Sequence, residues 1–151
     1  MSVIVAKRSL STIEYVRQAQ RIVDILQERL TKYQKKLNAN VRYKHLAKST
    51  FYPIWNAPLF DAQTVYRQVQ LANLTKVKDK ESFNKRLTHL NQASQYLKLL
   101  ESDITTLYTS CSSVIKDQFI IVLTQAIDKE VALIAGVKSS DKLHFQDIVS
   151  D

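Results

Sequence analysis

The feature that most constrains the fold of this chain is a regular apolar repeat in residues 83–107. Its positions recur at steps of three and four residues, and they are Phe83, Leu87, Leu90, Ser94, Leu97, Leu100, Ile104 and Leu107. This spacing predicts an α-helix with one largely apolar face. Such a helix has to bury that face against partners of similar length, so we expect a bundle of long helices.

The composition favours long helices over a β-sheet fold. The 151 residues include one glycine and two prolines, and 45% of them are apolar. Hairpins need more glycine and Asn-Gly turn signals than this chain contains. A chain of this length is expected to form one domain, residues 1–151. The lone Cys111 cannot form an internal disulfide and is expected to be a small buried apolar residue.

The first helix is predicted over residues 11–37, after an N-terminal arm of residues 1–10. Ser11 and Glu14 have the S-x-x-E spacing of a capping box, which marks a helix start. The N-A-N sequence at residues 38–40 is expected to end this helix, because asparagine favours turns over helix interiors.

The second helix is predicted to be broken near Pro53 and Pro58. Residues 41–52 have helical spacing, but each proline removes a backbone donor and clashes with the preceding turn. The helix is expected to resume at Pro58 and to run to about Val77. Trp55 is expected to anchor the bend in the core.

The third helix is predicted to carry the repeat of residues 83–107. It is expected to begin near Asp79 or Ser82, after a loop at residues 76–82, because these side chains can cap a helix start. It is expected to end at the S-C-S-S sequence of residues 110–113.

The fourth helix is predicted to begin at a Ser112 or Ser113 cap and to end near Ala135. Gly136, the only glycine, suits the left-handed residue that follows many helices. Residues 137–151 are then expected to be a frayed tail. Four long helices with short connections predict an all-α fold, an antiparallel up-down four-helix bundle.

The net charge of +8 is confined to the first third of the chain. Residues 1–50 hold eleven lysines and arginines against three acidic residues, whereas residues 51–151 hold eleven of each sign. Such confinement predicts a positive face directed at an anionic partner. The candidate nucleic-acid-binding residues on this face are Arg17, Arg21, Lys32, Lys35, Lys36, Arg42, Tyr43 and Lys44.

The order of residue types in this basic region favours RNA or DNA as the partner. In residues 42–45, rings alternate with cations. Splayed bases stack on aromatic and arginine planes, while lysine and arginine hold phosphates. Two other partners stay open, an acidic protein that meets the basic face of a helical scaffold and anionic lipid beneath the first helix. We expect no membrane partner, because the apolar stripe of the first helix is needed for packing within the bundle.

No group of residues has the spacing of a catalytic or metal site. The three histidines form no H-x-x-x-H or H-E-x-x-H pair, and Cys111 has no neighbouring histidine to activate it. Asp128 and Glu130 lie two residues apart on a helix and point in different directions. We therefore predict a protein that is not an enzyme and has no cofactor. No apolar run approaches the roughly 18 residues of a membrane span, so we expect a cytoplasmic protein.

Several short motifs along the chain occur together in one protein family. They are the AKRSLSTIE segment at residues 6–14; Arg42, Tyr43 and Leu46; Tyr66, Val69, Ala72 and Asn73; and Arg86, His89, Leu90 and Ala93. With these motifs the chain resembles the accessory variability determinant proteins, which are small basic four-helix-bundle proteins of diversity-generating retroelements.

This resemblance implies a function as well as a fold. Proteins of that family assemble as basic pentameric barrels, bind the reverse transcriptase of the element and nucleic acid, and have no catalysis of their own. The chain would then help a reverse transcriptase to copy a template RNA into mutagenised cDNA. Apolar residues off the main helix stripes also favour self-association, and they are Val3, Ile4, Val5, Ile25 and Val122.

Overall fold

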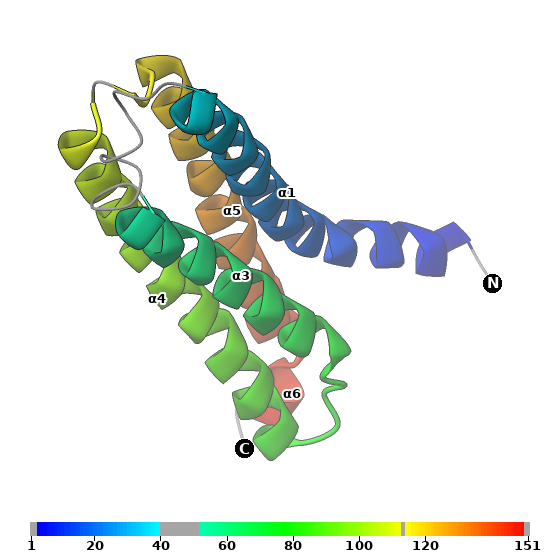
Figure 1. Ribbon diagram of the computed structural model, residues 1–151. Helices are drawn as coiled ribbons and strands as arrows, with labels where there is room; N and C mark the ends of the chain where they lie inside the picture. Colours follow the sequence, from blue (N-terminus) through cyan, green and yellow to red (C-terminus); the bar gives the residue numbers. More distant parts are fainter. Residues whose placement is uncertain (1–2, 40–51, 113, 150–151) are drawn as a thin grey trace.

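The computed structural model describes residues 3–39, 52–112 and 114–149 of the chain (Figure 1). These residues form α1, Val3–Ala39; α3, Tyr52–Leu74; α4, Lys80–Ser110; α5, Asp117–His144; and the short α6, Gln146–Val149. They contain no β-strand, so the prediction of an all-helical fold with four long helices is confirmed. The helical spacing noted in residues 41–51 lies outside the described residues.

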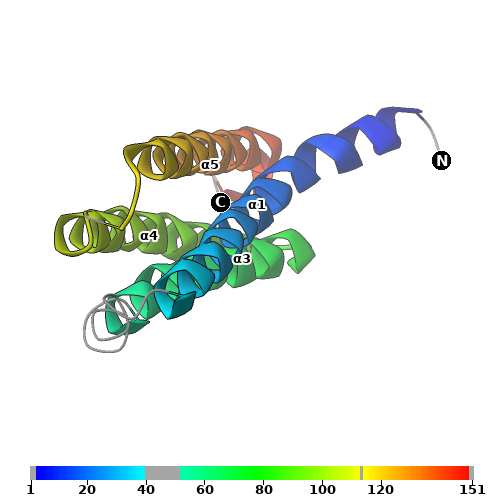
Figure 2. The ribbon, with the colours of Figure 1, turned by 45° about the horizontal axis from the view of Figure 1, so that its top comes forward.

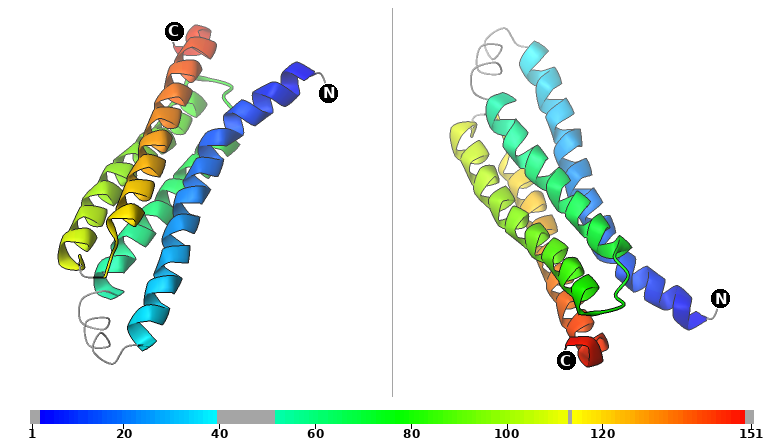
Figure 3. Two further views of the ribbon diagram at one scale, coloured as in Figure 1. Left: turned by 90° about the horizontal axis from the view of Figure 1, so that it is seen from above. Right: turned by 90° about the horizontal axis from the view of Figure 1, so that it is seen from below.

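The four long helices pack side by side around one apolar core (Figures 1 and 3). Helix α1 packs mainly against α3 and α5, and α4 packs against the same two helices. Gln18 of α1 donates a hydrogen bond from Nε2 to the carbonyl oxygen of Ala126 in α5 at 3.0 Å. The rings of Phe60 in α3 and Tyr96 in α4 meet edge to face, with centroids 6.5 Å apart. The N-terminal end of α1 projects beyond its neighbours (Figure 2).

Helix α4 carries the predicted repeat on its buried face. Six of its eight positions are buried, and they are Phe83, Leu90, Leu97, Leu100, Ile104 and Leu107. The Asp79 carboxylate accepts from the Ser82 amide at 2.8 Å, and the Ser82 hydroxyl accepts from the Asp79 amide at 3.1 Å. The expected start of this helix near Asp79 is therefore confirmed, as is the burial of Cys111 just after its end.

Three aromatic rings from α1, α3 and α5 fill the core near the start of α3. Trp55 is fully buried and stacks on Phe119, with centroids 5.9 Å apart and planes 18° apart. Tyr33 meets Trp55 edge to face at 5.8 Å. The expected burial of Trp55 in the core is confirmed, but the bend that it was expected to anchor is absent, because α3 is continuous through this residue. A large aromatic side chain shared by three helices fixes how far each can slide along the others.

Helix α1 begins at Val3, so the predictions of an arm over residues 1–10 and of a helix start at Ser11 are wrong. The helix passes through Ser11, which therefore does not serve as an N-cap. Residues 3–10 contain no proline or glycine, and extending an existing helix costs less than starting one. The local capping signal is thus overridden.

Helix α3 is continuous from Tyr52, so the predicted break near Pro53 and Pro58 is wrong in this part of the chain. Pro53 stands in the first turn, where its missing N–H would have no partner in any case. Pro58 lies inside the helix and removes one bond to the preceding turn. Both Pro58 and Trp55 are buried, and this packing offsets the lost bond.

Helix α5 begins and ends later than predicted. Its N-cap is Lys116 rather than Ser112 or Ser113. Val114 and Ile115, which precede the cap, are buried. They lie in a turn in which the Ile115 amide donates to the Cys111 carbonyl at 2.9 Å, so the helix starts only after this turn.

The expected helix end at Gly136 and the frayed tail from residue 137 are also wrong. The helix runs through Gly136 to His144, and no described glycine has a positive φ. Asp141 pairs with the buried Arg86, and Phe145 packs edge to face on Phe83 at 6.1 Å. These contacts with α4 hold the end of the chain in helical form.

Candidate nucleic-acid interface

The solvent face of α1 carries five of the predicted binding residues. Their side chains are all exposed, and they are Arg17, Arg21, Lys32, Lys35 and Lys36. Eighteen residues span five turns of an α-helix, so Arg17 and Lys35 lie on the same line along the helix, roughly 27 Å apart. The structure thus aligns most of the basic residues of α1 on its outer side, and this set is called the α1 face below.

Two acidic residues lie on the same face and offset part of its charge. Glu28 and Lys32 form an ion pair at 3.1 Å, with both side chains well exposed. The Asp24 carboxylate accepts from Gln20 Nε2 at 2.8 Å. Among the described residues, no ion pair forms with the other four cations of the α1 face. Lys32 is therefore the weakest of the predicted binding residues.

A depression of about 230 Å³ lies where the α1 face meets α3. Arg17 and Arg21 border it from α1, together with Val16, Gln20 and Asp24, and Tyr66 borders it from α3. The Tyr66 ring is half-buried, so one part packs in the bundle while another reaches the depression. Two guanidinium groups beside a phenol ring can hold phosphate oxygens and stack on a base.

Tyr66 is the residue that the sequence reasoning missed at this site. It was assigned to the second helix and to a family motif, and nothing in the sequence places it beside Arg17 and Arg21. The predicted aromatic partner, Tyr43, lies outside the described residues, as do Arg42 and Lys44. These three residues therefore stay predictions.

Arg29 also belongs to α1 but differs from the α1 face in its burial and its contact with α5. Its guanidinium sits over the Phe119 ring of α5, 5.8 Å from the centroid, and its side chain is half-buried. This arrangement is a cation–π contact that covers the aromatic core cluster. The basic residues of α1 therefore divide between a packing role and an exposed face.

The described part of α3 and α4 gives structural roles to most residues of the family motifs. Val69, Leu90 and Ala93 are buried in the core, and the Ala72 carbonyl accepts from Arg86 Nη1 at 2.8 Å. His89 Nδ1 lies 2.7 Å from Gln68 Oε1. These residues specify helix packing, so their presence does not by itself indicate nucleic-acid binding.

Two buried carboxyl groups were not anticipated. Burial and the negative charge of Glu14 raise the pKa of Glu130 to about 8, and neither of its carboxyl oxygens has a hydrogen-bond partner among the described residues. Burial and the neighbouring Asp103 raise the pKa of Asp61 to about 7.

Neither Asp61 nor Glu130 lines the depression beside Arg17 and Arg21. Within residues 3–39, 52–112 and 114–149, no three His, Cys, Asp or Glu side chains gather to hold a metal ion.

The chain matches no protein-family model, no curated protein and no solved structure. The resemblance to the accessory variability determinant proteins therefore stays a prediction. No helix in the described part of the chain is both long enough and apolar enough to cross a bilayer.

Proposed function

We propose that this chain is a non-catalytic accessory protein that binds single-stranded nucleic acid, most readily RNA, through the α1 face. The observation that carries the proposal is the depression where Arg17 and Arg21 of α1 meet Tyr66 of α3. Cations alone would serve any anionic partner, whereas a partly exposed ring beside them suits a splayed base. Lys35 and Lys36 are exposed roughly 21 Å further along α1 and would hold phosphates further along the same strand.

The family resemblance supplies the biological setting of this proposal. In it, the protein binds a reverse transcriptase in the cytoplasm and supports template-RNA-primed, mutagenic cDNA synthesis in a diversity-generating retroelement. The helices would form an antiparallel up-down bundle. Between α1 and α5, Glu14 lies near Lys129 and Gln18 bonds to Ala126, so the residue numbers rise on one helix and fall on the other. The pairs Phe60–Tyr96 and Gln68–His89 have the same opposite order between α3 and α4.

Self-association, as a ring of five by the resemblance, belongs to the same proposal. Of the residues first offered for it, Ile25 packs against the core and Val122 is half-buried. Self-association is instead supported by apolar side chains that α5 exposes, among them Ile121, which is 49% exposed, and Val131, which is 45% exposed. A subunit interface would cover such side chains.

Fluorescence anisotropy with a labelled single-stranded RNA tests the α1 face. Replacing Arg17 and Arg21 together by glutamate should weaken binding at least about tenfold, because it removes two phosphate contacts and adds repulsion. The matched control replaces Lys98 and Lys142, exposed residues of α4 and α5, by glutamate. It has the same net charge and should bind nearly as the unchanged protein does. Equal losses of RNA affinity in both variants would mean that only the overall charge matters, and they would refute specific binding by the α1 face.

The alternative is a helical scaffold whose basic face meets an acidic protein. The half-buried Tyr66 distinguishes the two proposals, since a carboxylate needs the arginines but no ring to stack on. Vesicles of anionic lipid, mixed with the protein and floated by centrifugation, test the remaining possibility of peripheral membrane binding.

A further inference from the structure

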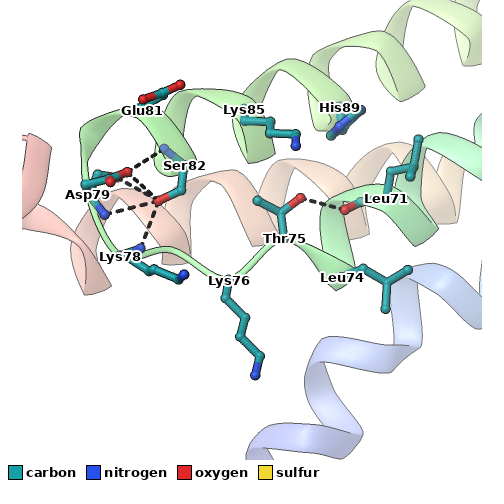
Figure 4. A pocket seen from close by; sticks show the side chains of 10 residues that line it. All are labelled: Leu71, Leu74, Thr75, Lys76, Lys78, Asp79, Glu81, Ser82, Lys85 and His89. Atoms are coloured by element: carbon teal, nitrogen blue, oxygen red, sulfur yellow. Dashed lines mark hydrogen bonds between the residues drawn. The ribbon is translucent and has the colours of Figure 1, made fainter.

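A second depression, of about 580 Å³, lies at the loop between α3 and α4 (Figure 4). Its walls come from the last turn of α3, from loop residues 75–79 and from the first turns of α4. None of its lining residues belongs to the α1 face, so it is a separate surface. It is called the α3–α4 pocket below.

The charge of the α3–α4 pocket is positive. Lys76, Lys78 and Lys85 line it with exposed side chains, and no ion pair engages them among the described residues. The Asp79 carboxylate is already used to cap α4 through Ser82. Figure 4 shows the carboxylate of Glu81 pointing away from the lysines. The ammonium groups are therefore left to an incoming anion.

The same pocket exposes aliphatic side chains. Leu74 is 75% exposed and Leu71 is 36% exposed, and both stand at the end of α3 beside the lysines. Two exposed leucines beside three lysines without an ion pair among the described residues give this surface both apolar and positive groups for a partner to contact. The partner that complements it has apolar groups for the leucines and anionic groups for the lysines.

The pocket fits a nucleic acid poorly. Among its described lining residues the one ring is that of His89, which is half-buried and whose Nδ1 lies 2.7 Å from Gln68 Oε1. Burial and the charge of Lys85 lower the pKa of His89, which disfavours the charged ring that would attract a phosphate. At the N-terminus of α4 the Asp79 carboxylate accepts from the Ser82 amide and places a negative charge where a phosphate would otherwise bind.

We propose that the α3–α4 pocket docks a helical peptide segment of a protein partner that carries leucine-like side chains together with Asp or Glu on one face. The apolar side chains pack on Leu71 and Leu74, and the carboxylates pair with Lys78 and Lys85. This assignment rests on the proposed function, because it gives the protein partner of that proposal a surface separate from the α1 face. The two partners could then bind at the same time.

The test uses a synthetic peptide of about 12 residues, roughly three helical turns, with leucine and glutamate at helical spacing. A second peptide replaces every glutamate by glutamine, and a third replaces every leucine by alanine. Binding to the full chain is followed by two-dimensional NMR, with Leu74→Ser and the double variant Lys78→Glu/Lys85→Glu as pocket variants. Leu74 and both lysines are exposed, so these changes leave the core untouched.

The proposal expects the leucine–glutamate peptide to shift the amide signals of the pocket. It also expects each pocket variant, and each altered peptide, to weaken binding at least about tenfold. The Lys98→Glu/Lys142→Glu control should bind this peptide nearly as the unchanged chain does, and the pocket variants should keep their affinity for RNA.

Peptide binding that is unchanged in the pocket variants would overturn the proposal, as would the absence of pocket shifts. A loss of RNA affinity in the pocket variants that the control does not share would assign the pocket to nucleic acid instead. These outcomes do not depend on the variant in which Arg17 and Arg21 are replaced. If that variant kept its affinity for RNA, only the proposal that the α1 face binds RNA would be refuted.

Discussion

The Arg86 guanidinium of α4 forms a two-bond ion pair with the Asp141 carboxylate of α5. Nε lies 2.5 Å from Oδ2, and Nη2 lies 3.3 Å from Oδ1. The same guanidinium donates from Nη1 to the Ala72 carbonyl at the end of α3. The side chains of the pair are only 9% and 14% exposed, so Arg86 ties three helices together at a nearly dry position.

Replacing Asp141 by alanine should destabilise the fold by about 3–5 kcal/mol, because it leaves a buried guanidinium without its carboxylate. Urea denaturation measures the change. The control is Asp147→Ala, at an exposed carboxylate of α6. Joint replacement of Arg86 by methionine and Asp141 by leucine should recover much of the loss, since no charge is then buried. A small, equal effect of Asp141→Ala and Asp147→Ala would show that the pair does not hold the helices.

Replacing Gly136 by alanine should raise the free energy of unfolding by about 1 kcal/mol. Gly136 lies inside α5, and an added Cβ would meet nothing within 4 Å, so only the helix propensity changes. The paired control is Ala135→Gly at the exposed neighbouring position, which should lower the stability by a similar amount. Thermal melts suffice. A destabilising Gly136→Ala would indicate the left-handed helix end that the sequence suggested.

Replacing Glu130 by glutamine should change how stability depends on pH. The pKa of Glu130 is about 8 in the folded protein against an ordinary value of 4.5, so between these values the folded state keeps a proton that the unfolded chain has released. The free energy of unfolding therefore falls as pH rises through this window, by up to about 1.4 kcal/mol per pH unit.

In the glutamine variant this contribution is absent, so its stability relative to the unchanged protein should increase with pH. Urea denaturation at about pH 5 and about pH 8 measures the difference. The exposed Glu101→Gln is the control for the loss of one carboxylate elsewhere on the chain. A parallel profile for the Glu130 variant would contradict the raised pKa.

How much the sequence predicts depends on whether a signal is local. The repeat of α4 and its start near Asp79 are set by residues a few positions apart, and the sequence predicts both. Gly136 was misread, because a glycine after an apolar run suggests a helix end, whereas α5 is continued by the contact between Asp141 and Arg86. Those two residues are 55 positions apart, and no local pattern links them.

The candidate site shows the same division. That α1 carries exposed cations follows from the spacing of Arg17, Arg21 and Lys35 on one helix. The position of Tyr66 beside them depends on the register between α1 and α3, which is fixed in part by Tyr33 and Trp55 in the core. That register depends on contacts between residues far apart in the chain, so no local pattern in the sequence predicts it.

Replacing Tyr66 by leucine should weaken single-stranded RNA binding by roughly 1–3 kcal/mol, the usual contribution of one stacked base. Leucine keeps an apolar side chain in the half-buried position, and phenylalanine, which keeps the ring, should restore most of the affinity. The slope of log affinity against log salt should stay the same, because no phosphate contact is lost. An unaltered affinity for the leucine variant would favour the acidic-protein alternative.

The most direct test of the α1 face is an NMR titration of the unchanged protein with a short oligouridylate at about 50 mM salt, where phosphate contacts are strong. The amide signals of residues 16–24 and of Tyr66 should shift together and saturate at one concentration, and the shifts should fade as salt is raised. Shifts confined to residues 75–89, or no shifts at all at this salt concentration, would contradict nucleic-acid binding by this face.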